Sequence, residues 1–99
     1  MSKLNKELSL KIEHNMITDG TSTFKLSGAE RKLLIHFYEH PGRIFSRVEL
    51  LSLGWPDSIV SERSVNIAVG NIRNLLQFFD SGSALVTIPK EGYKSDFSF

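Results

Sequence analysis

Apolar and polar residues alternate near the start of the chain and then change to a helical spacing. The alternation over residues 8 to 12 predicts a strand with one buried face. Asp19-Gly20 suits a tight turn, and an extended stretch containing Thr and Phe follows it over residues 21 to 26. The segment from about residue 7 to 26 therefore predicts a small antiparallel sheet.

Three helices are predicted in the middle of the chain. Ser27 and Ser46 are each followed three residues later by a glutamate, which is the capping box of a helix start. Helical spacing of apolar residues then predicts helices over about residues 28–40, 47–54 and 62–79, and Ser61 can cap the third. The apolar residues that show this helical spacing are Leu33, Leu34, Phe37, Tyr38, Val48, Leu50, Leu51, Leu53, Val65, Ala68, Val69, Ile72, Leu75, Leu76 and Phe79.

The chain closes with a predicted β-hairpin over about residues 84–98. Two extended segments, 84–88 and 93–99, flank the turn sequence Pro89-Lys90-Glu91-Gly92. The order is thus sheet, three helices and hairpin, which predicts an α+β fold. With 99 residues and no linker-like tract, the whole of residues 1–99 is expected to form one domain.

Composition narrows the function classes without naming one. Twelve Lys and Arg against eleven Asp and Glu give a formal net charge of +1, so overall charge does not indicate a nucleic-acid partner. The absence of cysteine excludes disulfides and thiolate metal sites, and it is compatible with the cytoplasm. No apolar run has the length of a transmembrane helix, and no signal peptide is evident. We therefore expect this chain to be soluble and unexported.

The predicted outward face of the third helix has an unusual composition. It carries Arg63, Asn66, Ile67, Gly70, Asn74 and Gln77, with Ser64, Asn71 and Arg73 on its flanks. Asn, Gln and Gly disfavour helices, whereas a solvated face is usually rich in Lys and Glu. Asn and Gln can bind adenine edges, and an exposed Ile can contact thymine methyl groups. The alternative is an ordinary polar surface with one stray Ile.

Cations placed around this face support a nucleic-acid partner. Arg47 starts the second helix, Arg63 and Arg73 lie on the third, and Lys90 and Lys94 lie in the hairpin. The N-termini of the second and third helices add backbone donors suited to phosphates. Gly70 would let the backbone approach DNA closely.

Several spaced motifs identify a family resemblance. They are His-Pro-Gly-Arg-Ile-Phe-Ser-Arg-Val-Glu-Leu-Leu at 40–51, Trp55, Ser-Glu-Arg-Ser-Val-Asn-Ile at 61–67, and Ile-Arg-Asn-Leu at 72–75. Together they resemble the OmpR/PhoB-type winged-helix effector domain of bacterial transcription regulators. The hairpin sequence Thr-Ile-Pro-Lys-Glu-Gly-Tyr at 87–93 resembles the ToxR/CadC-like branch.

The resemblance implies a winged helix-turn-helix with a four-stranded N-terminal sheet, in which the third helix enters the major groove and the wing meets the minor groove. Promoter DNA is then the implied partner. The DNA-binding set expected from residues and resemblance together is Arg47, Arg63, Ser64, Asn66, Ile67, Gly70, Asn71, Arg73, Asn74 and Lys90. Trp55, Asp57 and Ser58 match the loop that contacts RNA polymerase in this family, although Trp55 is equally suited to anchor that loop.

The sequence departs from the family at Gly70 and Asn71, where a basic pair is usual. Affinity for DNA is then expected to be low, so that a second copy on tandem or inverted sites is needed. Members of the ToxR/CadC-like branch are often anchored in the inner membrane. A membrane tether is thus a hypothesis about the full-length protein.

The sequence also leaves two other function classes open. His14, His36 and His40 are the candidates for an enzyme, and the last two are spaced to share a metal. No third ligand motif accompanies them, no glutamate occupies the usual zinc-protease position between them, and no phosphate-binding glycine loop, nucleophile elbow or pair of catalytic carboxylates appears, so we expect no enzyme, no metal and no cofactor. The second alternative is a winged helix that docks on another regulator or on RNA polymerase, which the near-zero net charge would suit.

Overall fold

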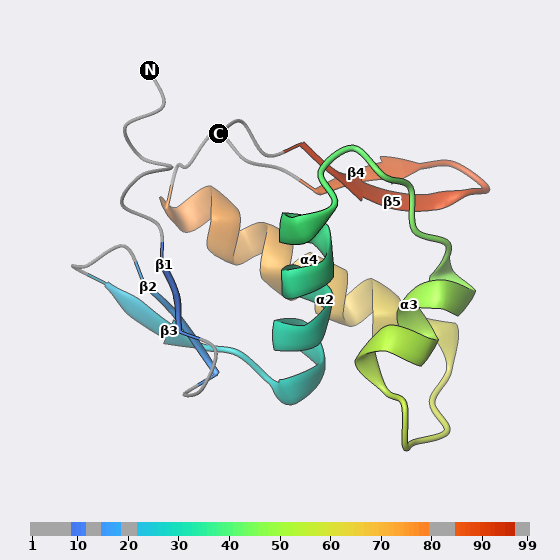
Figure 1. Ribbon diagram of the computed structural model, residues 1–99, viewed down its shortest axis with the longest axis horizontal. Helices are drawn as coiled ribbons and strands as arrows, with labels where there is room; N and C mark the ends of the chain where they lie inside the picture. Colours follow the sequence, from blue (N-terminus) through green and yellow to red (C-terminus); the bar gives the residue numbers. More distant parts are fainter. Residues whose placement is uncertain (1–8, 12–14, 19–21, 80–84, 97–99) are drawn as a thin grey trace.

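The computed structural model describes residues 9–11, 15–18, 22–79 and 85–96. Its elements follow the predicted order of sheet, three helices and hairpin (Figure 1). Predictions for residues 1–8, 12–14, 19–21, 80–84 and 97–99 lie outside the described residues, among them the turn at Asp19-Gly20 and the histidine His14.

The N-terminal sheet has three antiparallel strands, β1 (Ser9–Lys11), β2 (Met16–Thr18) and β3 (Thr23–Lys25), with β2 in the centre. Ile17 pairs with Leu10 on one side and Phe24 on the other. The resemblance implied four strands, whereas the described residues form three.

The helices are α2 (Gly28–Glu39), α3 (Arg47–Gly54) and α4 (Glu62–Phe79). Both predicted capping boxes are confirmed: Ser27 and Ser46 accept from the backbone of Glu30 and Glu49, and the two glutamates accept from the serine N–H groups. At the start of α4, the described hydrogen bond joins the Ser64 N–H to the Ser61 carbonyl, so side-chain capping by Ser61 stays a prediction.

One hydrophobic core lies between α2, α3 and α4, the β2–β3 strands and the hairpin. Its buried apolar members are Ile17, Leu26, Leu33, Leu34, Phe37, Phe45, Leu50, Val65, Ala68, Val69, Ile72, Leu76, Leu85 and Tyr93. Two of the apolar residues at helical spacing lie outside the core: Val48 and Tyr38 are 64% and 51% exposed. Val48 lies two residues from the buried Leu50, which places it about 200° away around α3.

The hairpin consists of β4 (Leu85–Ile88) and β5 (Gly92–Ser95), paired in antiparallel register. Its turn has the backbone of a type II turn: Glu91 N–H donates to the Ile88 carbonyl, and Lys90 takes a φ of 68° at the position that usually requires glycine. Phe45, just before α3, exchanges two backbone hydrogen bonds with Tyr93. These bonds fix the hairpin beside the start of α3.

Candidate nucleic-acid interface

The outward face of α4 is as the sequence predicts. Val65, Val69 and Ile72 are buried in the core, which turns the opposite side of the helix to solvent. On that side Ile67 is 55% exposed. The predicted residues exposed with it are Arg63, Asn66, Asn71, Asn74 and Gln77, and Ser64, Gly70 and Arg73 are half-buried.

Asn66 is held in place by the hairpin and by α3. Its Oδ1 accepts from the Tyr93 hydroxyl at 2.7 Å and from Arg47 Nε at 3.1 Å. The Arg47 guanidinium also lies 5.1 Å from the centroid of the Tyr93 ring, and one of its terminal nitrogens is 3.5 Å from the hydroxyl. Because arginine can only donate, the atom facing it must be the amide oxygen. Asn66 therefore directs its NH₂ donors away from this cluster.

The orientation of Asn66 changes its expected chemistry. Bidentate adenine recognition needs the asparagine oxygen as an acceptor and the nitrogen as a donor. In Asn66 the oxygen already accepts two hydrogen bonds. The NH₂ group is suited to acceptors such as guanine O6 and N7 or thymine O4. The sequence did not predict that Tyr93 orients Asn66. The motif around Tyr93 indicates a hairpin, but it does not indicate which side chain the tyrosine hydroxyl contacts.

Two other predicted site residues are held by internal contacts. Asn71 Nδ2 donates to Glu30 Oε2 at 2.7 Å, which links α4 to the start of α2. Arg73 donates to the Leu85 carbonyl at 3.0 Å and to Thr87 Oγ1 at 3.1 Å. In this structure Arg73 therefore fastens β4 to α4, and it has fewer donors left for a phosphate than the sequence suggested.

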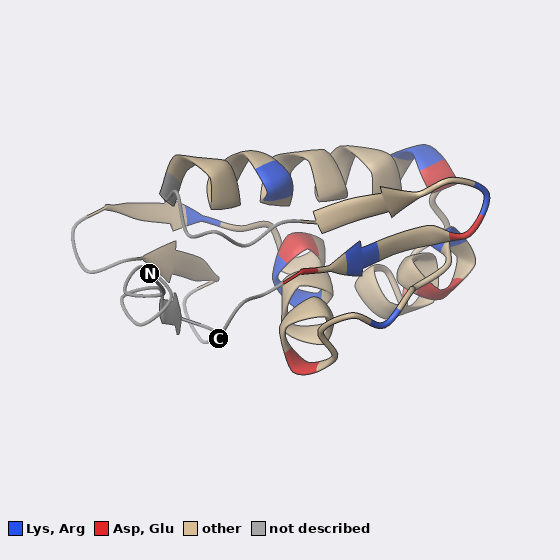
Figure 2. Cartoon of the chain, turned by 90° about the horizontal axis from the view of Figure 1, so that it is seen from above, with Lys and Arg blue, Asp and Glu red and all other residues tan. Residues whose placement is uncertain are grey.

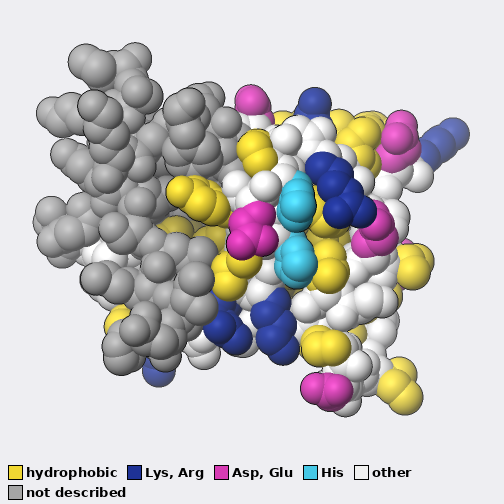
Figure 3. Space-filling view, viewed as in Figure 1, with side chains coloured by type: hydrophobic (Ala, Val, Ile, Leu, Met, Phe, Trp, Pro, Cys, Tyr) yellow, Lys and Arg dark blue, Asp and Glu magenta, His cyan; other side chains and the backbone are white. Residues whose placement is uncertain are grey.

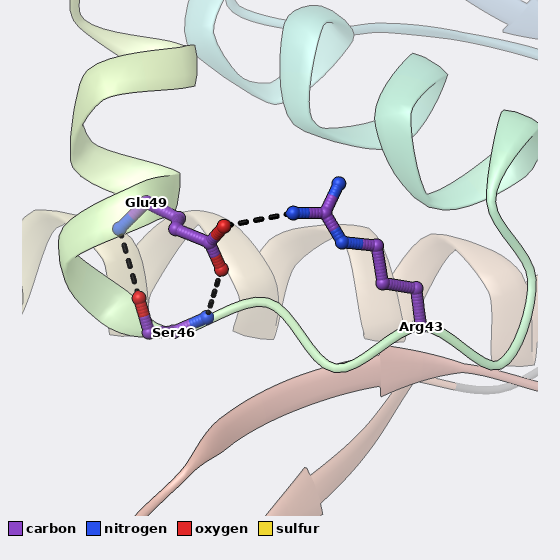
Figure 4. A network of polar contacts seen from close by, with 3 residues as sticks. All are labelled: Arg43, Ser46 and Glu49. Carbon is purple, nitrogen blue, oxygen red and sulfur yellow. Dashed lines mark hydrogen bonds and ion pairs between the residues drawn. The ribbon is translucent and has the colours of Figure 1, made fainter.

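The start of α3 is built from a compact polar network (Figure 4). Glu49 completes the capping box with Ser46 and also forms an ion pair with Arg43 at 2.8 Å. Both charged side chains are about half exposed, so the ion pair itself adds little stability. Its effect is to hold the first turn of α3, where Arg47 begins the helix beside Asn66.

Basic and acidic residues are mixed around the interface. Figure 2 shows Lys or Arg beside Asp or Glu at the hairpin tip and at the adjoining end of α4. The sequence places Lys90 next to Glu91 and Arg63 next to Glu62, and all four are exposed. The field is therefore only moderately positive, in keeping with the net charge of +1.

The α3–α4 loop lies beside the same face. An open cleft of about 480 Å³ runs between the loop, the start of α2 and α4, and its lining includes Trp55, Asp57, Ser58, Ser64 and Ile67. Trp55 ends α3, donating its N–H to the Leu51 carbonyl, and packs partly buried against the core. Trp55 thus anchors the loop, and its contact with a polymerase stays a prediction.

The family is shown by comparison with known proteins. Residues 20–95 match the family described as "Transcriptional regulatory protein, C terminal". The chain belongs to this family. This match confirms the resemblance to OmpR/PhoB-type and CadC-like winged helices that the sequence motifs indicated.

Relatives and solved structures agree with this family. The phosphate regulon transcriptional regulatory protein PhoB of Rhizobium meliloti is 32% identical over 88 residues, which are 88% of this chain and 39% of that protein. The structure titled as the DNA-binding domain of E. coli CadC is 30% identical, with a TM-score of 0.81 over 93% of this chain and 88% of that one.

A structure of the AdeR DNA-binding domain in complex with an intercistronic region has a TM-score of 0.76 at 21% identity, covering 93% of this chain and 96% of that one. At this identity the likeness shows the fold. The winged helix-turn-helix fold class is confirmed.

The chain spans 35% and 39% of the length of the first two curated relatives that it matches. Within the part of the chain that the structure describes, no helix is long and apolar enough to cross a membrane.

Proposed function

We propose that this chain binds double-stranded promoter DNA sequence-specifically, as the DNA-binding domain of a bacterial transcription regulator. The observation that carries the proposal is the outward face of α4, where Asn66 and the 55% exposed Ile67 lie next to the fixed hairpin. This face enters the major groove, and the exposed Lys90 at the hairpin tip meets the minor groove or its phosphates. The family's shared role is regulatory, and we propose no enzymatic activity.

Individual contacts follow from the geometry of the face. Asn66 donates to base acceptors, and Ile67 contacts a thymine methyl group. Arg63 and the free N–H groups at the start of α3 contact phosphates, which set the position of the domain on the duplex. Asn74, one turn beyond Gly70, extends the same face along the groove.

Selection of bound duplexes from a randomised DNA pool tests this proposal, at low salt and again near physiological ionic strength. We expect an enriched motif at both salt concentrations. Asn66→Ala and Ile67→Ala should relax preference at single positions, while Arg63→Gln should weaken all duplexes alike. If the chain retains DNA but enriches no motif, its binding rests only on attraction to the DNA phosphate backbone. No retention at either salt concentration would favour the alternative of a protein-docking winged helix.

A contact with RNA polymerase is proposed for the α3–α4 loop. Asp57 and Ser58 are exposed. Ile59, which follows them in the loop, is fully exposed, an unusual position for an isoleucine. Asp57→Ala with Ser58→Ala should leave DNA affinity unchanged and lower transcription from a bound promoter in a purified system. Equal transcription by the variant and the parent chain would contradict the contact.

We also propose that two copies bind adjacent half-sites, because one moderately charged domain makes few phosphate contacts. Affinity and sedimentation measured with duplexes that carry one or two copies of the selected motif test this proposal.

We further propose that the full-length protein is located in the cytoplasm and is tethered to the inner membrane. Sequencing the complete gene tests the tether.

A further inference from the structure

Three potential metal ligands gather at the C-terminal end of α2. His36, Glu39 and His40 each offer one ligand atom, and these atoms all lie within 4.8 Å of one another. Their i, i+3 and i+4 spacing puts them on one side of the helix. Figure 3 shows two adjacent histidine side chains with an acidic side chain next to them on the viewed surface. The structure thus adds Glu39 as a third potential ligand to the two histidines that the spacing indicated.

The surroundings of the two histidines restrict their movement. The rings of His36 and His40 lie edge-on to the Phe45 ring, with centroids 6.4 and 6.3 Å away. The His40 N–H donates to the His36 carbonyl at 3.1 Å, which sets the backbone spacing of the pair. His36 is half-buried, while Glu39 and His40 are exposed, so the Glu39 carboxylate has room to turn toward the two rings.

The local charge is compatible with a cation. Two basic side chains lie near the cluster: Lys32, one turn of α2 before His36, and Arg43, which lies 4.4 Å from the centroid of the Phe45 ring. Its guanidinium is paired with Glu49 at 2.8 Å, which offsets part of its repulsion. The carboxylate of Glu39 adds a negative charge within the ligand set itself.

We propose that His36, Glu39 and His40 bind one divalent transition-metal ion of the zinc class. Two imidazole nitrogens and one carboxylate oxygen form a ligand set that zinc accepts with water in the open position. Metal–ligand distances of about 2.0 to 2.2 Å would bring the three ligand atoms to about 3.4 Å from each other, a rotamer adjustment. Imidazole ligands disfavour Mg²⁺ and Ca²⁺, which prefer sites made of oxygen alone.

The site is separate from the proposed DNA interface. In Figures 1 and 2, α4 lies behind α2 as seen from the side that Figure 3 displays. The ion would link His36 and Glu39 in the last turn of α2 to His40, the C-cap residue of that helix. The chain then leads to Phe45, which is bonded to the hairpin through Tyr93. An ion bound to the folded chain alone stabilises it by mass action and leaves the outward face of α4 open.

Titration of the purified metal-free chain with ZnCl₂ tests the site, followed by calorimetry and by NMR of the histidine rings. We expect one ion per chain, shifts of the His36 and His40 ring signals, and a melting temperature that rises with zinc concentration. MgCl₂ should cause none of these changes. His40→Gln should weaken zinc binding by about tenfold or more, since even loss of a group that supports a ligand costs that much. Glu39→Gln should weaken it as well.

Glu91→Gln is the matched control for Glu39→Gln, because it removes an exposed carboxylate in the hairpin turn and leaves the cluster intact, so it should leave zinc affinity unchanged. The melting temperatures of all variants without metal show whether each one folds. The proposal is overturned if zinc gives no saturable heat and no histidine shift. It is also overturned if His40→Gln and Glu39→Gln bind zinc like the parent chain, or if one ion binds two chains.

Discussion

Gly92 is required at its position for two separate physical reasons. Its φ of 141° is rare for residues with a side chain, and an added Cβ would lie 1.9 Å from the Phe45 carbonyl oxygen. We expect Gly92→Ala to lower the free energy of unfolding by about 2 kcal/mol or more. Chemical denaturation measures this loss.

Gly42→Ala is the control for the effect of backbone strain. Gly42 has a φ of 84°, but an added Cβ would meet nothing within 4 Å. Its substitution should therefore cost only about 1 kcal/mol, the strain of a left-handed backbone. Equal losses in the two variants would show that the hairpin adjusts to the clash at Gly92.

Tyr93 sets the direction of Asn66 through its hydroxyl group. Tyr93→Phe keeps the buried ring but removes the 2.7 Å hydrogen bond to Asn66 Oδ1. We expect a stability loss of about 1 kcal/mol and a loss of part of the base discrimination by the Asn66 NH₂ group, which is below the roughly 1 to 3 kcal/mol of a full bidentate pair. Affinities for the selected duplex and for single-base variants of it measure the second effect.

Tyr38→Phe serves as the control, because Tyr38 is on α2 and is 51% exposed. This substitution should leave base discrimination unchanged. If Tyr93→Phe also discriminates like the parent chain, then the hydroxyl does not position Asn66 for base contacts.

At the scale of an element, α4 contains a glycine that weakens the helix. An added Cβ at Gly70 would meet nothing within 4 Å, so Gly70→Ala should stabilise the chain by about 0.5 to 1 kcal/mol. If α4 lies deep in the major groove, the same methyl group should lower DNA affinity. Thermal melting and a DNA titration together measure the two opposite effects.

Gln77→Ala, near the C-terminal end of α4, should change neither the melting temperature nor the DNA affinity strongly. A Gly70→Ala variant that is more stable and binds DNA as tightly as the parent chain would contradict the close approach of the backbone.

The capping box at α3 gives a second prediction for an element. Ser46→Ala removes the hydroxyl that accepts from the Glu49 N–H at 3.1 Å. The expected cost is about 1 kcal/mol, or a fall of about 4 to 8 °C in melting temperature for a domain of this size. Ser52→Ala, at an exposed position of the same helix, should stay within about 0.5 kcal/mol. A loss of similar size in both variants would argue against a specific role for the cap.

At the scale of the whole molecule, the mixed charges limit the dependence of DNA binding on salt. Arg63, Lys90 and Lys94 are the cations around the interface whose side chains make no hydrogen bond or ion pair among the described residues, whereas Arg47 is held by Asn66 and Tyr93. Three phosphate contacts predict a slope of log K against log salt of about −3. Lys90→Gln should reduce the slope by about 1.

Arg73→Gln should instead lower stability and leave the slope unchanged, because Arg73 donates to β4. A flatter slope in this variant would show that Arg73 leaves the hairpin to contact DNA. Affinities at four salt concentrations are sufficient to distinguish the two variants.

Local sequence determined most of the fold. The capping boxes at Ser27 and Ser46, the apolar stripe of α4 and the turn at Pro89-Lys90 depend on neighbours within a few residues, so their patterns are visible in the chain. The same periodicity identified the outward face of α4, because burying one side of a helix exposes the other.

Only the tertiary structure decided what those exposed side chains contact. Asn66, Asn71 and Arg73 form hydrogen bonds with residues far away in the sequence, and Arg47 does so with Tyr93. The two partners of each bond are 12 to 46 residues apart. No local pattern encodes such distances. The orientation of the Asn66 amide depends on donors from α3 and β5 that meet only after the chain has folded, and it therefore could not be predicted from spacing alone.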